Sequence, residues 1–209
     1  MKVNEIYYSI QGEGIQSGLP TIFIRLTGCN LRCSYCDTKY AYTKGKELTI
    51  DEISLKLREF TCNTVCITGG EPLIHENIFE LINNLSRNKY SLLIETNGSK
   101  KINSLLSFQK LRISLDIKCP SSGMQDQMIM KNIDKLRECD QLKFIIQSKD
   151  DYHYGVEILK KFKPMSFVFF QPVWGFDLKQ LADWMITDGI QAQLGIQLHK
   201  FIWGEKTKK

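Results

Sequence analysis

Strand-like and helix-like segments alternate along this chain, and this order restricts the fold more than any other feature of the sequence. Seven short segments are apolar or β-branched, at residues 21–26, 64–67, 91–95, 111–116, 142–147, 166–170 and 193–197. Strands that alternate with helices form parallel sheets with right-handed crossovers. Six or seven such strands are too few for a complete eight-stranded barrel. We therefore expect an α/β fold, either an incomplete barrel or an open sheet.

Helical periodicity marks the segments between these strands. Apolar residues recur at the spacing of one helix face in segments 50–60, 78–85 and 178–186. Thr49 and Glu52 form a capping-box signal at the start of the first of these helices. We also predict helices over residues 126–138 and 151–162.

Polar residues cluster where the predicted strands end. The sequences TGGEP (68–72), ETNG (95–98), DIK (116–118) and QPVW (171–174) each follow or close a strand. In parallel α/β folds the C-terminal ends of the strands form the ligand-binding face. Any one cluster could be an ordinary turn, but four clusters at four strand ends predict a binding site there.

Length and composition favour one globular domain. The chain has 209 residues, of which 43% are hydrophobic, enough for one sizeable core. No linker-like stretch or repeat interrupts it, so we expect a single domain over residues 1–209 that ends in a short basic tail. The tail carries part of the formal net charge of +5, at Lys200, Lys206, Lys208 and Lys209. Basic and aromatic residues are not interleaved along a face, so a solvated tail is favoured over a nucleic-acid-binding arm.

The sequence also predicts a cellular setting. It has no apolar leader at its start and no run of about 18 apolar residues, so we expect neither a secretion signal nor a membrane span. Seven cysteines are an odd number in a chain too large to need disulfide staples. Metal ligation in the reducing cytoplasm fits these cysteines better than an oxidised framework.

Cys29, Cys33 and Cys36 are the strongest candidates for metal ligands. They are spaced CxxxCxxC within GCNLRCSYCDT (28–38), and no fourth Cys or His follows nearby. Structural zinc sites close with four ligands, and Fe–S clusters are usually held by four thiolates. A cubane held by three thiolates leaves one iron free to bind another ligand. A zinc knuckle or a set of unrelated thiols is the alternative.

The other four cysteines lie in or beside predicted strands and helices, and we interpret them as structural thiols. They are Cys62, Cys66, Cys119 and Cys139. The spacing of Cys62 and Cys66 leaves a second site open.

The cysteine spacing, Tyr35 just before the third cysteine and the downstream GGEP sequence resemble the radical S-adenosylmethionine (SAM) superfamily. This resemblance implies a [4Fe–4S] cluster on the three cysteines, with SAM bound to the free iron. It also implies a 5′-deoxyadenosyl radical that removes a hydrogen atom from the substrate. The protein then positions the cofactors and excludes side reactions.

The resemblance also implies which residues bind SAM. Gly70 would receive the amino group of SAM, because a residue without Cβ lets a ligand approach the backbone. Glu71 is expected to organise this loop. Tyr35 lies against adenine or packs within its own loop. The full predicted SAM set is Tyr35, Cys36, Asp37, Gly70, Ser114, Asp116, Lys118, Gln171, Pro172, Val173 and Trp174.

The N-terminal sequence EIYYSIQGEG (5–14), which leads into FIRLTGC (23–29), narrows the resemblance. Together with Asp37 and Thr38 it closely resembles the 7-carboxy-7-deazaguanine synthase family, from Glu5 to Lys200. That family implies conversion of 6-carboxy-5,6,7,8-tetrahydropterin to 7-carboxy-7-deazaguanine, with loss of ammonia, in queuosine or 7-deazapurine biosynthesis. It also implies Mg²⁺, an electron donor such as flavodoxin or ferredoxin, a homodimer, and a shortened, modified TIM-like (β/α) barrel.

Substrate residues follow from the same resemblance and are chemically reasonable. A pterin presents an amide-and-amine edge, which Gln11 and Glu13 can bind with complementary donors and acceptors. Arg25 offers a planar fork for a carboxylate, or forms a salt bridge at the barrel rim. Thr38 would bind Mg²⁺, although on sequence alone it is a cap or turn residue. The full predicted substrate set is Ile10, Gln11, Gly12, Glu13, Arg25, Thr68 and His199.

Some questions stay open at this level. His199 is nearly as plausible as a core or surface histidine, and His75 and His153 have no assigned role. The proton acceptor of the reaction is not identifiable. One alternative function is a radical SAM activase of a glycyl-radical enzyme, although the QGEG sequence favours the pterin enzyme. Another is an Fe–S electron carrier or a zinc-stabilised binding module, which would not need Gly69 and Gly70.

Overall fold

The computed structural model describes residues 1–204. The basic residues predicted for the tail therefore lie outside the described residues, except Lys200. The strands are β1 (Lys2–Ile10), β2 (Pro20–Leu26), β3 (Lys46–Glu47), β4 (Thr64–Gly69), β5 (Ser91–Thr96), β6 (Leu111–Lys118), β7 (Gln141–Ile146), β8 (Phe167–Pro172) and β9 (Gln193–Leu194). The helices are α1 (Ile50–Leu57), α2 (Ile78–Arg87), α3 (Lys149–Phe162), α4 (Leu178–Thr187) and α5 (Leu198–Trp203).

All described strands belong to one sheet, in the order β3-β1-β2-β4-β5-β6-β7-β8-β9. The seven strands from β2 to β9, without β3, are parallel, whereas β1 pairs antiparallel with β2 and β3 antiparallel with β1. Within residues 1–204 β3 and β9 do not pair with each other, so the sheet does not close. The fold is thus the expected incomplete barrel.

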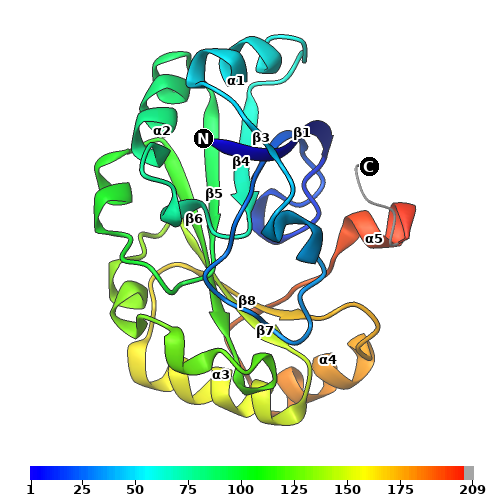
Figure 1. The fold of residues 1–209 in the computed structure, drawn as a ribbon. Helices are drawn as coiled ribbons and strands as arrows, with labels where there is room; N and C mark the ends of the chain where they lie inside the picture. Colours follow the sequence, from blue (N-terminus) through cyan, green and yellow to red (C-terminus); the bar gives the residue numbers. More distant parts are fainter. Residues whose placement is uncertain (205–209) are drawn as a thin grey trace.

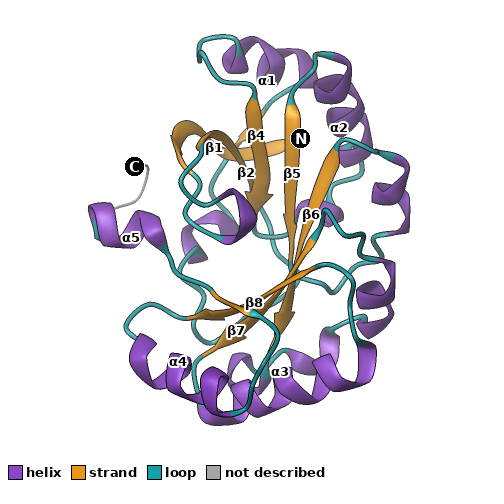
Figure 2. Cartoon of the chain, turned by 180° about the vertical axis from the view of Figure 1, so that it is seen from behind, coloured by secondary structure: helices purple, strands orange, loops and turns teal. Residues whose placement is uncertain are grey.

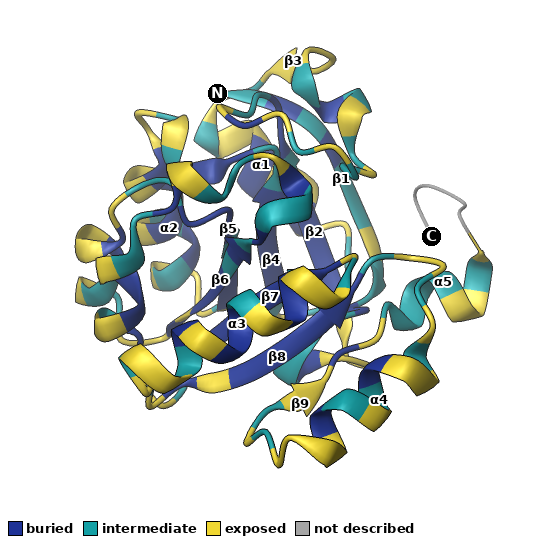
Figure 3. Cartoon of the chain, turned by 90° about the horizontal axis from the view of Figure 1, so that it is seen from below, coloured by how far each residue is buried: buried dark blue, intermediate teal, exposed yellow. Residues whose placement is uncertain are grey.

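The sheet is strongly twisted, and helices cover its outer side (Figure 1). Figure 2 shows α1 and α2 beside β4, β5 and β6, and α3 and α4 beside β7 and β8. The central strands are almost wholly buried, whereas these helices expose their outward faces (Figure 3). No helix among residues 1–204 is long and apolar enough to cross a membrane.

Alternation along each strand separates the core from the inner face of the sheet. Ile24, Ile67 and Ile94 are fully buried and belong to the main core cluster. Their neighbours Arg25, Thr68 and Glu95 point to the other side, because successive side chains of a strand face opposite ways. The inner face is therefore polar over the C-terminal halves of the parallel strands.

Most of the predicted elements are confirmed. Each of the seven predicted strands overlaps one parallel strand, although β9 is shorter than the predicted 193–197. The Thr49–Glu52 capping box is present at the start of α1, with Glu52 N to Thr49 Oγ1 at 3.1 Å and Thr49 N to Glu52 Oε2 at 2.7 Å.

Two parts of the structure differ from the prediction. The continuous helix predicted over 126–138 is wrong: the segment forms short 3₁₀ turns at Gln125–Gln127 and Met130–Lys135. The buried Asn132 donates to Lys100 O at 2.8 Å, and this tertiary bond ties the segment to the preceding loop. We did not predict β1 or β3. The sequence of β1 mixes polar and aromatic residues, and we interpreted part of it only as a family motif. Its Val, Ile and Tyr residues are nevertheless typical of strands.

Candidate active site

One cavity of about 710 Å³ lies at the C-terminal ends of the parallel strands. Its lining combines the β1–β2 loop, the cysteine loop, the strand ends and α5. All predicted site residues line this cavity except Ser114, which is fully buried and accepts a hydrogen bond from Gln141 Nε2 at 2.8 Å. The structure thus gathers at one place residues that are up to 189 positions apart in the sequence, from Ile10 to His199.

The cysteine loop forms one wall of the cavity. Cys29, Cys33 and Cys36 are partly buried and not in disulfides, and all three contribute to the lining. Leu31 N donates to Cys29 Sγ at 3.4 Å, and Cys36 N donates to Cys33 O at 3.3 Å. Among residues 1–204, no three Cys, His, Asp or Glu side chains are arranged to hold a single metal ion.

The GGEP loop packs against the cysteine loop. A Cβ at Gly70 would collide with Gly28 O, and Gly69 has φ +137°, so both positions require glycine. Glu71 is fully buried and accepts bonds from Leu73 N at 3.0 Å and Asn97 N at 2.6 Å. Burial raises the pKa of Glu71. Its bonds agree with the expected role in organising the loop.

A chain of alternating charges crosses the inner face of the sheet. Lys143 Nζ lies 2.9 Å from Glu13 Oε2 and 3.1 Å from Asp116 Oδ1, and Asp116 Oδ2 lies 2.9 Å from Lys118 Nζ. Burial opposes ionisation of Asp116, but the charges of Lys118 and Lys143 outweigh it and hold its pKa below the usual value. These ion pairs join the predicted substrate loop to the predicted SAM residues.

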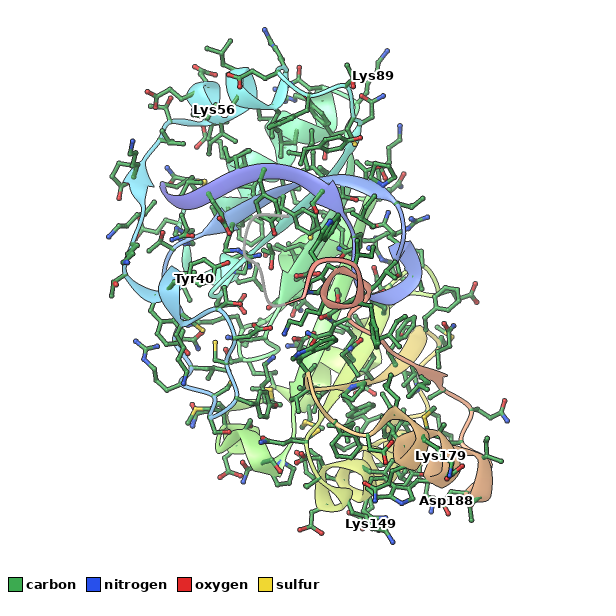
Figure 4. The ribbon with its side chains drawn as sticks, turned by 90° about the vertical axis from the view of Figure 1, so that its right-hand side faces the viewer. Tyr40, Lys56, Lys89, Lys149, Lys179 and Asp188 are labelled. Carbon is green, nitrogen blue, oxygen red and sulfur yellow. The ribbon has the colours of Figure 1, made fainter. Side chains whose placement is uncertain are left out.

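Arg25 is held by the strand next to it. Its Nε donates to Glu5 Oε1 at 2.8 Å and its Nη2 to the Tyr7 hydroxyl at 2.9 Å. Tyr40 Oη also donates to Glu5 Oε1, at 3.0 Å. Figure 4 labels Tyr40 about halfway along the molecule, and the exposed Lys56 near the top of the view. The guanidinium therefore has a carboxylate partner within the protein.

Hydrogen bonds fix the residues predicted to bind the pterin. Gln11 Oε1 accepts from Gly12 N at 2.8 Å, which folds the side chain back on its own loop. Thr68 Oγ1 donates to Glu95 Oε2 at 2.7 Å, and Gln11 Nε2 lies 3.5 Å from Glu95 Oε1. Glu95 is thus a carboxylate in the middle of the predicted substrate residues.

Helix α5 covers the β1–β2 loop. Leu198 N donates to Gly12 O at 2.9 Å, and Gln197 Nε2 donates to Glu13 Oε1 at 2.9 Å. A Cβ at Gly12 would collide with the imidazole of His199, so this close approach requires glycine. Burial lowers the pKa of His199 and favours the neutral ring.

Asp37 and Thr38 lie at the same edge of the cavity. Thr38 Oγ1 donates to Asp37 Oδ1 at 2.8 Å, and Asp37 Oδ2 lies 2.7 Å from Lys200 Nζ. This ion pair holds Lys200 of α5 against the loop that follows the cysteines. The bonds to Lys200 and Thr38 outweigh burial and lower the pKa of Asp37.

Several polar atoms of residues that line the cavity have no hydrogen-bond partner among residues 1–204, and two of them stand out. The Tyr35 hydroxyl and Gln171 Oε1 are buried without a hydrogen bond. Both belong to residues predicted to bind SAM. Beside Gln171, Trp174 is 38% exposed and forms an edge contact with Phe201 of α5, with ring centroids 5.3 Å apart.

Several cavity residues were not assigned a role from the sequence. Glu95 and Asn97 belong to the strand-end cluster ETNG (95–98). Lys143 is a lone lysine between apolar residues of a strand, and such a buried charge could have indicated a site residue. Tyr40 had no such signal, nor did Glu5, which does not line the cavity but bonds both Arg25 and Tyr40. Among the histidines left without a role, His75 Nε2 bonds Thr27 O at 2.9 Å and His153 packs on Tyr152.

The four cysteines interpreted as structural do not line the cavity. Cys66 and Cys119 are fully buried, and Cys66 belongs to a small cluster with Phe23 and Leu93. Cys62 Sγ lies 3.3 Å from Pro20 O. Cys62 therefore packs against backbone.

Residues 23–163 match the family model described as the radical SAM superfamily. The chain is 36% identical to the 7-carboxy-7-deazaguanine synthase of Thermoplasma acidophilum, over 98% of both chains. It is 37% identical to the synthase of Methanospirillum hungatei, over 97% of this chain and 85% of the relative. The chain belongs to the 7-carboxy-7-deazaguanine synthase family.

The structure agrees with this membership. It superposes on the crystal structure of QueE from Escherichia coli with a TM-score of 0.75 and 24% identity, covering 95% of this chain and 94% of that one. The likeness confirms the fold, a partial radical SAM barrel. As a member of this family the chain is a radical SAM enzyme, for which a [4Fe–4S] cluster and SAM are the implied cofactors.

Proposed function

We propose that this enzyme converts 6-carboxy-5,6,7,8-tetrahydropterin to 7-carboxy-7-deazaguanine with loss of ammonia, in queuosine or 7-deazapurine biosynthesis. The observation that carries the proposal is that the three cysteines and the polar residues Gln11 and Glu13 line the same cavity, in a chain that belongs to the 7-carboxy-7-deazaguanine synthase family. The same cavity is lined by polar groups that can bind a small bicyclic substrate.

The residues present fit a [4Fe–4S] cluster. Cys29, Cys33 and Cys36 supply three unpaired thiols on one loop, and Gly70 lets the neighbouring loop pack directly against Gly28 and Cys29, where a Cβ would collide. When bound, the cluster and SAM supply a one-electron reduction and a 5′-deoxyadenosyl radical that removes a hydrogen atom from the substrate. The protein's part is to hold both groups next to the substrate and to exclude water.

The SAM site lies between the cysteine loop and the ends of β6 and β8. Gly70 lines the cavity and would receive the amino group, and the orphaned Tyr35 hydroxyl and Gln171 Oε1 are free to bond a polar ligand. Asp116 and Lys118 present a paired carboxylate and ammonium on the same wall. Pro172, Val173, Trp174, Cys36 and Asp37 complete the proposed lining. Ser114 supports this wall from beneath through Gln141.

The pterin site lies between the β1–β2 loop and β2, β4 and α5. Gln11, Glu13 and the backbone of Ile10 and Gly12 present donors and acceptors to the amide-and-amine edge. Arg25 uses Nε and one terminal nitrogen within the protein, and the rest of its fork is available to the substrate carboxylate. Thr68 and the neutral His199 add contacts.

We further propose that Mg²⁺ binds Thr38 and the substrate carboxylate. Thr38 lines the cavity, and Mg²⁺ takes oxygen ligands and keeps several waters.

Three further proposals concern the surroundings of the enzyme. An electron donor such as flavodoxin or ferredoxin would reduce it in the cytoplasm. A homodimer would cover exposed apolar side chains, among them Phe167 at 44% and Ile186 at 78% exposure. Light scattering on the purified enzyme tests the dimer, and a monomeric mass would contradict it.

The decisive experiment is turnover under anaerobic conditions. The reconstituted enzyme is mixed with SAM, dithionite and 6-carboxy-5,6,7,8-tetrahydropterin, and products are identified by mass spectrometry. We expect 7-carboxy-7-deazaguanine, with SAM recovered. Cys33→Ala should lose both cluster absorbance and product, whereas Cys139→Ala, away from the cavity, should keep both. Cleavage of SAM without any deazapurine product would refute the pterin assignment and favour an activase.

A further inference from the structure

Asn97 contacts one of the three cavity cysteines through its side chain. It follows β5 directly and is 6% exposed. Its Nδ2 lies 3.7 Å from Cys29 Sγ and 3.2 Å from Asn30 Oδ1. An amide –NH₂ has two hydrogens, so it can donate to both atoms at once.

The orientation of this amide is determined by its other end. Asn97 Oδ1 accepts from Ser99 N at 3.0 Å and from Ser99 Oγ at 2.6 Å. A backbone N–H can only donate, so the oxygen must face Ser99 and the –NH₂ must face Cys29. A flipped amide would lose the bond from Ser99 N, which an –NH₂ cannot accept.

The backbone of Asn97 is fixed as well. Its N–H donates to Glu71 Oε2 at 2.6 Å, and Thr96 Oγ1 donates to Glu71 Oε1 at 2.8 Å. The buried Glu71 therefore ties the end of β5 to the loop that packs on the cysteine loop. This arrangement places a donor against Cys29 Sγ without any freedom to turn away.

We infer that Asn97 is a positioning residue that sets the reduction potential of the cluster through its hydrogen bond to Cys29 Sγ. This inference rests on the proposed function, because it requires a cluster on Cys29. Hydrogen bonds to the sulfurs are one determinant of Fe–S reduction potentials. A donor stabilises the reduced, more negative cluster more than the oxidised one, so it raises the potential and eases electron uptake.

Removing the donor should make the cluster harder to reduce. Asn97→Ala loses the –NH₂ but keeps the backbone bond to Glu71, and we expect about a tenfold shift of the reduction equilibrium, or about 59 mV for a one-electron couple. Asn97→Asp keeps the shape of the side chain and faces Cys29 with an acceptor, so its potential should fall further. Ser99→Ala is the matched control: it removes the bond from Ser99 Oγ to Asn97 Oδ1 and the bond from Asn30 Nδ2 to Ser99 Oγ, but it keeps the Asn97 –NH₂ and the bond from Ser99 N that orients it.

The test is an anaerobic redox titration of each holoenzyme, followed by electron paramagnetic resonance, with iron and sulfide measured first. We expect the potential to decrease in the order Ser99→Ala, Asn97→Ala, Asn97→Asp, with Ser99→Ala close to wild type. Equal potentials, or a rise in Asn97→Ala, would overturn the inference while leaving the proposed function intact. A wild-type enzyme without a cluster would overturn both. If Asn97→Ala does not retain its cluster, the potential of Asn97→Asp decides the question.

Discussion

Replacing Lys143 with methionine should destabilise the enzyme, because it leaves buried carboxylates without their shared cation. The Lys143 side chain is 4% exposed and bridges Glu13 at 2.9 Å and Asp116 at 3.1 Å. Removing one partner of a buried ion pair costs about 3–5 kcal/mol. In this variant Asp116 remains paired with Lys118, and Glu13 still accepts a hydrogen bond from Gln197. We therefore expect a loss of stability near the lower end of this range, about 3 kcal/mol. For a chain of this length that corresponds to a fall in melting temperature of roughly 6–12 °C.

The assay is thermal unfolding of the cluster-loaded enzyme under anaerobic conditions, paired with pterin binding. Lys143→Met should also weaken pterin binding, because Glu13 loses the ammonium that holds its carboxylate in place. Lys179→Met is the matched control: Lys179 is exposed on α4, and its substitution should change stability by no more than about 0.5 kcal/mol. If Lys143→Met melts within about 2 °C of wild type, the chain of ion pairs does not stabilise the site and the reasoning fails.

Two further predictions concern the cavity edge. Thr38→Ala should reduce the response of turnover to Mg²⁺ while iron and sulfide content stays unchanged, and an identical Mg²⁺ titration would remove Thr38 from the metal site. His199 has a lowered pKa in the folded state, so the unfolded state binds its proton first as pH falls below about 6.5. The wild type should therefore lose stability relative to His199→Gln between about pH 7.5 and 5, as measured by thermal unfolding, and parallel curves would show that the ring does not titrate differently on folding.

The order of strands and helices along the chain could be predicted because it depends on local sequence signals. Seven apolar segments separated by helical periodicity specify a parallel sheet, and the polar groups then fall at one edge of it. The segment 126–138 shows the limit of such signals. Its apolar spacing fits a helix, but the buried Asn132 bonds the backbone of Lys100, 32 residues earlier, and no local pattern contains that contact.

The predicted site residues, apart from Ser114, line one cavity, but their hydrogen-bond and ion-pair partners could not be predicted. Arg25 inside an apolar strand indicated that a partner must exist. That partner is Glu5 on β1, a strand that was not expected, in antiparallel register with β2. Lys143 and Glu13 are 130 residues apart and meet only because the β1–β2 loop crosses the inner face of the sheet.

The two faces of the sheet explain why the polar side chains of the site bond one another across strands. The alternation that buries Ile67 and Ile94 against the helices also points Thr68 and Glu95 into the cavity. Side chains in the cavity bond across neighbouring strands, as Thr68 does to Glu95 at 2.7 Å, before any ligand arrives. A site held by such bonds spends little free energy on ordering when it binds a ligand. Its polar groups can then distinguish a ligand that pairs with them from one that leaves them unpaired, which is how a small substrate is selected.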